Sequence, residues 1–197
     1  MSQELEEESM GAFPDRWIRD MAIKKNMIEP FSERVDGPGI ISYGLQPAGY
    51  DARLDPDIKI FDWARGQGKV LDPLDVDPSL YFDKTAHPSF AMPPHSYILA
   101  LSLEYFRIPR TCVVRGAAKT IYSSVGVNID IAGIHPGWEG RLRFHISNPN
   151  HVPIRLYGNM GIIYLEFHKI EGTVERDYSE LKYPRFHKSE KALPKQS

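Results

Sequence analysis

The chain has 197 residues and a mass of 22.5 kDa, the size of one domain. Its 42% hydrophobic residues can build a core, but no stretch approaches the roughly 18 consecutive apolar residues of a membrane-spanning helix. The 24 basic and 26 acidic residues give a formal net charge of −2, which lacks the strong positive balance of nucleic-acid-binding domains. We therefore expect a globular protein with neither a membrane nor a nucleic acid as partner.

The N-terminal residues and the cysteine content bear on the compartment. Residues 1–12 are acidic and polar, so we expect a solvated tail rather than a secretory signal. Cys112 is the single cysteine, which excludes an internal disulfide and any structural zinc site built on two thiolates. These features favour a reducing, cytoplasmic location.

The next elements along the chain are one helix and then many strands. Apolar residues at helical spacing after Pro14 predict a short helix over residues 15–27. Beyond it, runs bounded by Pro, Gly, Asn or Asp predict strands over residues 40–45, 52–61, 97–106, 111–115, 125–131, 141–147, 154–157 and 162–168. Residues 62–94, rich in Asp and Pro, predict a long excursion with little regular structure. Short strands at this spacing are typical of an all-β sandwich or barrel.

The clearest strand pattern lies in residues 141–147, with the sequence RLRFHIS. Leu142, Phe144 and Ile146 alternate with polar residues, so they should face the core. The opposite face carries Arg141, Arg143, His145 and Ser147, and it should face either solvent or an anionic ligand.

Six segments, in order, resemble the dCTP deaminase family, a branch of the dUTPase-like β-barrel trimers. They are FPDRWIRDMAIKKNMIEPF, ISYGLQPAGYDARL, MPPHSYILALSLEYFRIPR, KTIYSSVG, HPGWEGRLRFHISN and VPIRLYGNMGIIYLEF. The resemblance implies an all-β, dUTPase-like distorted barrel or double-sheet domain over residues 13–170, with a short N-terminal helix. It also implies a homotrimer and a C-terminal arm or lid over residues 171–197.

The resemblance further implies where chemistry should lie. In that family, dCTP is deaminated to dUTP without zinc, in sites between subunits, by a Glu that shuttles protons. A Ser and an Arg of a basic-Ser-x-x-x-Arg segment hold the triphosphate and support the reaction. At the matching positions this chain has His145 for the Glu, Thr120 for the Ser and Ser124 for the Arg, and it keeps the basic residue as Lys119.

Two further comparisons with the family concern the lid and a sister activity. In the lid, Tyr178 and Lys182 fit the family pattern, whereas Phe186 lies near the place of the usual Gln. The segment AGYDARL, which contains Asp51, resembles the first motif of dUTP hydrolases. The water-activating Asp of those enzymes is replaced by His135.

These replacements define two hypotheses. Loss of a general base typically costs ~10²–10⁴ in rate, and Ser cannot replace the bidentate anchor of an Arg. We therefore expect a trimer that has lost deamination and acts as a nucleotide-binding, regulatory or structural assembly protein, with dCTP or dTTP as ligand or a larger assembly as partner. In the alternative, an active dCTP deaminase uses His145 as its base and holds the triphosphate with Lys119, Thr120 and Lys182. In both, Mg²⁺ would come with the triphosphate rather than be held by the protein.

The simpler interpretation of these residues is that they have no special role. His145 would then be a polar strand residue facing water or a subunit interface, and Lys119 and Thr120 would belong to a solvated loop. The histidines fit no common metal-ligand spacing, and the His-x-Glu with Pro-Cys-x-x-Cys signature of zinc deaminases is absent, so the sequence predicts no metal site.

Overall fold

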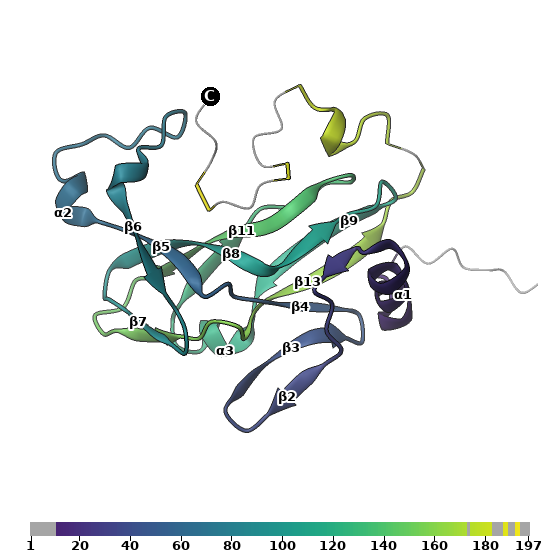
Figure 1. Ribbon diagram of the computed structural model, residues 1–197, viewed down its shortest axis with the longest axis horizontal. Coiled ribbons are helices and arrows are strands. Elements are labelled where there is room, and N and C mark those ends of the chain that lie inside the picture. The colour runs from purple at the N-terminus through teal and green to yellow at the C-terminus, as the bar shows by residue number, and fades with distance from the viewer. Residues whose placement is uncertain (1–10, 173, 183–186, 189–191, 194–197) are drawn as a thin grey trace, which may run out of the picture.

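The computed structural model describes residues 11–172, 174–182, 187–188 and 192–193. The described chain is mostly antiparallel β-sheet with one substantial helix at its N-terminal end (Figure 1). None of the described helices has the length and apolar character needed to cross a membrane. The predominance of antiparallel strands confirms the expected all-β architecture.

The helix α1 spans Asp15–Lys25 and begins where the sequence predicts. Asp15 in its first turn and Lys24 and Lys25 in its last turn both complement the helix dipole. The helix ends two residues earlier than predicted, because Asn26 adopts a left-handed conformation with φ of 53° and closes the C-terminus. Its buried side chains, Ile18 and Ala22, attach the helix to the sheets.

Two larger sheets and one small sheet make up the body. The first sheet has the strand order β10-β11-β8-β5-β6, and β1 pairs with β8 outside this path. In that order the strands are β10 (Asn128–Ile131), β11 (Glu139–Asn148), β8 (Ser96–Arg107), β5 (Asp57–Phe61), β6 (Tyr81–Thr85) and β1 (Ile28–Glu29). The second has the order β2-β3-β4-β13-β9, formed by Val35–Gly37, Ile40–Gln46, Gly49–Arg53, Gly161–Lys169 and Cys112–Ala118. The small sheet pairs β7 (Phe90–Met92) with β12 (Ile154–Leu156). Isolated bridges join Leu54 to Ser102 and Val114 to Ile134, so the two larger sheets meet around one core.

Strand β11 confirms the alternation seen in the sequence. Leu142, Phe144 and Ile146 are each 2% exposed or less, whereas the residues between them are only half-buried. A bulge interrupts the pairing of β11 with β8 between Arg141 and Arg143. At that point Arg141 donates to the carbonyl oxygen of Ser102 and pairs with Asp55.

Two predictions about elements were wrong. The predicted strand over residues 52–61 is divided between β4 and β5, because Pro56 cannot donate to a ladder and Leu54 and Asp55 bond to other segments. The excursion over residues 62–94 is more regular than expected, since it contains α2 (Trp63–Gly66), a 3₁₀ turn (Pro78–Leu80), β6 and β7. Residues 1–10 of the predicted acidic tail and much of the predicted arm lie outside the described residues.

Candidate functional site

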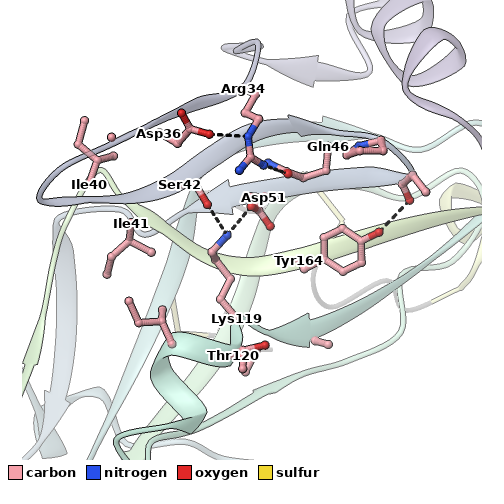
Figure 2. Close-up of a pocket in the computed structure, with 16 residues that line it drawn as sticks. Arg34, Asp36, Ile40, Ile41, Ser42, Gln46, Asp51, Lys119, Thr120 and Tyr164 are labelled. Atoms are coloured by element: carbon pink, nitrogen blue, oxygen red, sulfur yellow. Dashed lines mark hydrogen bonds and ion pairs between the residues drawn. The ribbon is translucent and has the colours of Figure 1, made fainter.

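A cavity of about 860 Å³ opens beside the β3–β4 hairpin. Its other walls are the end of β9, the start of the short helix α3 (Thr120–Ser123) and Tyr164 on β13 (Figure 2). A volume of this size lies within the range of sites for small molecules and cofactors.

At the base of the cavity Lys119 is held between two acceptors. Its Nζ donates to Asp51 Oδ2 and, at 3.1 Å, to Ser42 Oγ, and these three side chains converge from β3, β4 and the end of β9 (Figure 2). The side chains of Lys119 and Asp51 are only 14% and 5% exposed. Burial raises the pKa of Asp51, an effect that the hydrogen bond and charge of Lys119 oppose. Lys119 therefore offsets only part of the effect of burial on the pKa of the Asp51 carboxyl.

The rim of the cavity carries a second cation. Arg34 donates from Nε to Asp36 Oδ2 at 2.6 Å and from Nη1 to Gln46 Oε1 (Figure 2). Arg34 and Lys119 thus each lie against one carboxylate, and the four charges balance. An entering anion would have to compete with these carboxylates for both cations.

The shape of the cavity depends on a close backbone approach at the start of β13. A Cβ atom built on Gly161 would lie 2.0 Å from the carbonyl oxygen of Ser42 and 3.3 Å from Lys119 Cδ. Only glycine, which has no Cβ atom, allows the backbone of β13 to lie this close to Ser42 and Lys119.

The candidate site residues predicted from the sequence lie in three separate regions of the chain: around α3, on β11 and near Tyr178. Lys119 and Thr120 both line the cavity. Ser124 lies at the C-terminal end of α3 and outside the cavity lining, where its Oγ donates to the carbonyl oxygen of Ile121 at 2.8 Å.

His145 lies on β11, also outside the lining of this cavity. Its Nδ1 is 3.5 Å from Asp130 Oδ2, and its ring centroid is 5.2 Å from that of Tyr97. Tyr97 in turn stacks on Phe61 at 4.8 Å, with Trp63 packed edge-on against both. His145 therefore borders an aromatic cluster on the first sheet.

Tyr178, the lid residue whose contacts the structure describes, lines neither the large cavity nor the surroundings of His145. Tyr178 stacks on His135 with centroids 5.8 Å apart and helps to line a second cavity of about 220 Å³. Arg143 also lines that cavity, and burial lowers its pKa to about 10. Lys182 is exposed beyond the 3₁₀ turn Tyr178–Glu180, and Phe186 lies outside the described residues.

Sequence reasoning did not single out Arg34, Ser42 or Gln46, although Ser42 and Gln46 lie in the family-like segment ISYGLQPAGYDARL. Asp51 did carry a signal, because it lies in the segment AGYDARL, but its partner Lys119 is 68 positions away. Only the pairing of β4 with β13, and of β13 with β9, brings the two residues together.

Known proteins of similar sequence identify the family of this chain. Residues 12–170 match the family model described as dCTP deaminase-like. The chain belongs to the dCTP deaminase-like family. A dCTP deaminase from Rhodospirillum centenum is 39% identical over 171 residues, which are 87% of this chain and 91% of the relative. A dCTP deaminase from Wolbachia pipientis wMel is 36% identical over 173 residues, 88% of this chain and 92% of the relative.

A solved structure supports the fold. The structure of 2'-deoxycytidine 5'-triphosphate deaminase from Agrobacterium tumefaciens superposes with a TM-score of 0.63 at 13% sequence identity. The match covers 81% of this chain and 48% of that one. The dUTPase-like fold expected from the resemblance is therefore confirmed.

Proposed function

We propose that this protein is a homotrimer that binds a pyrimidine deoxynucleoside triphosphate, dCTP or dTTP, without deaminating it. The relatives are named dCTP deaminases, and the residues at the family's phosphate segment, Lys119 and Thr120, share a cavity large enough for a nucleotide. This convergence is the observation that carries the proposal. A regulatory or assembly role would use the bound nucleotide as a signal or as a structural element.

The loss of turnover is inferred from two of the replaced positions, Ser124 and His145. The hydroxyl of Ser124 is committed to a carbonyl of its own helix, and a serine offers no charge to a phosphate. The proton-shuttling Glu of the family is replaced by His145, whose ring packs beside Tyr97. Without a base at the reacting carbon, binding can persist while the chemical step is lost.

The same separation supports the proposed trimer. In one chain, His145, the lid residue Tyr178 and the cavity with Lys119 lie apart, whereas the family is expected to build its sites between subunits. A neighbouring copy would supply the surfaces that one chain leaves incomplete. Mg²⁺ would arrive with the triphosphate, since the carboxylates of Asp36 and Asp51 already face Arg34 and Lys119.

One observation favours the alternative, an active dCTP deaminase. Asp130 lies 3.5 Å from the Nδ1 of His145, and such a carboxylate can fix the tautomer of a histidine that acts as a base through its other nitrogen. The names of the relatives point the same way. In this alternative His145 would accept the proton of the attacking water.

Calorimetric titration of the full-length protein with dCTP and dTTP in Mg²⁺ tests binding, and an assay for dUTP and ammonia at high protein concentration tests turnover. We expect binding of at least one nucleotide and no turnover. Replacing Lys119 by Met should weaken binding at least ~10-fold, because a charged hydrogen bond to phosphate is lost. The matched control is Lys84→Met on β6, a lysine that lies over the ring of Phe82 and outside the cavity.

Each result decides between the hypotheses. Binding that weakens in Lys119→Met but not in Lys84→Met supports the proposal. The absence of binding overturns the nucleotide-binding function and leaves a purely structural one. Turnover that disappears in His145→Ala, with the oligomer intact, establishes the alternative.

A further inference from the structure

A pair of histidines lies at a corner where the chain passes between two sheets. His95 is in the turn between β7 and β8, and His151 is in the turn between β11 and β12. Because β7 pairs with β12 and β8 pairs with β11, the two turns lie at the same end of both pairs. The fold thus brings together two residues that are 56 positions apart in the sequence. Because the two histidines are so far apart in the sequence, the spacing of histidines along the chain does not predict that they pair.

The geometry of the pair matches a metal chelate. His95 Nε2 lies 3.1 Å from His151 Nδ1, and the ring centroids are 4.7 Å apart. Two imidazoles on one Zn²⁺, Ni²⁺ or Cu²⁺ ion at about 2.05 Å have nitrogens roughly 2.9–3.3 Å apart, for angles between square and tetrahedral. The same angles place the ring centroids roughly 4.5–5.2 Å apart. Both measured separations fall within these ranges.

The backbone around the pair is fixed from beneath by Asn148. This residue is 1% exposed, and its Nδ2 donates to the carbonyl oxygens of Pro93 and Val152, each at 3.0 Å. One buried amide therefore ties down the segments next to His95 and His151 together. Ser96 adds a hydrogen bond of 2.7 Å to Pro93. A chelate whose ligands are held in place before the ion arrives loses little entropy on binding.

We propose that His95 and His151 bind one divalent transition-metal ion, of the Zn²⁺, Ni²⁺ or Cu²⁺ class, and so clamp the two turns together. Both side chains are exposed, so the ion can reach them from solvent. Among the described residues no group of three or more His, Cys, Asp or Glu gathers around an ion, so water would complete the coordination. Each neutral imidazole keeps a proton on its other nitrogen, so the ion replaces the hydrogen bond between the rings.

The test uses untagged full-length protein, stripped of metal with EDTA and dialysed. Titration with ZnCl₂ by calorimetry should show one site per chain, and Zn²⁺ should raise the melting temperature by several degrees. His95→Asn and His151→Gln should each weaken Zn²⁺ binding at least ~10-fold. Asparagine suits position 95, because the backbone there has a φ of 53°, which Asn tolerates. Melting of the metal-free variants verifies that they fold.

The matched control is His87→Asn, which removes another exposed histidine, one whose Nδ1 is 3.5 Å from the side chain of Asn159. Loss of the site in both test variants, with the site retained in the control, supports the proposal. Zn²⁺ binding that is the same in all variants, or no Zn²⁺ binding by the wild-type protein, overturns it. A crystal soaked in ZnCl₂ gives an independent result, since anomalous density away from His95 and His151 alone would also overturn it.

Discussion

At the scale of single residues, two of the replaced positions of the family site, Ser124 and His145, are occupied by side chains with local roles of their own. Ser124 closes the end of α3 through Ile121, and His145 packs on Tyr97 beside Asp130. Neither position is blocked by a buried neighbour, because Ser124 is exposed and the side chain of His145 is 37% exposed. Larger or charged side chains could therefore be accommodated there.

This leads to a gain-of-function prediction. The double variant His145→Glu, Ser124→Arg should deaminate dCTP at least ~10²-fold faster than the wild-type protein, because it restores a proton shuttle and a charged phosphate anchor. The assay follows dUTP and ammonia in Mg²⁺, with each single variant as control. A wild-type protein that is active, and that loses activity in His145→Glu, would contradict the prediction.

The residue scale is also where sequence reasoning reached least far. The family patterns led to Lys119, Thr120 and Asp51, but not to the contact between Lys119 and Asp51, which arises only through two strand pairings. The pairing of His95 with His151 was out of reach for the same reason. Contacts between distant segments leave no local periodicity to detect.

At the scale of elements, long strands with one buried face were predictable and short ones were not. In β11 every second residue is buried, and β8 alternates in the same way on either side of three consecutive buried residues, 100–102. By contrast, β6 is half-buried or exposed along its whole length, and β1 and β7 have two and three residues. Such strands are held by their neighbours in the sheet, so their own residues carry little pattern.

The alternation in β11 predicts a sharp contrast between neighbouring positions. Ile146→Ala should lower the free energy of unfolding by about 2–4 kcal/mol, because it leaves a cavity at a fully buried site. Ser147→Ala, one residue later on the half-buried face, should change it by less than about 0.5 kcal/mol. Urea denaturation measures both. Equal effects at the two positions would contradict the register of β11 in the first sheet.

At the scale of the whole molecule, the proposed trimer accounts for the separation of the candidate residues. If a site needs surfaces from two copies, the isolated chain should not bind nucleotide well. Light scattering during size exclusion should give a mass of about three times 22.5 kDa, within the usual error of the method. A monomer that binds nucleotide as tightly as any oligomer would argue against shared sites.

The buried pair of Lys119 and Asp51 couples the proposed ligand to protons. A phosphate that draws Lys119 away leaves Asp51 in a low-dielectric site, where burial already raises its pKa, so the carboxyl should take up a proton as the nucleotide binds. Affinity should then fall as the pH rises. The measured binding enthalpy should differ between buffers of high and low ionisation enthalpy, a difference that Asp51→Asn removes. Each nucleotide that binds would thus bring one proton into the site with it, and the solution pH would set the fraction of sites that hold a nucleotide.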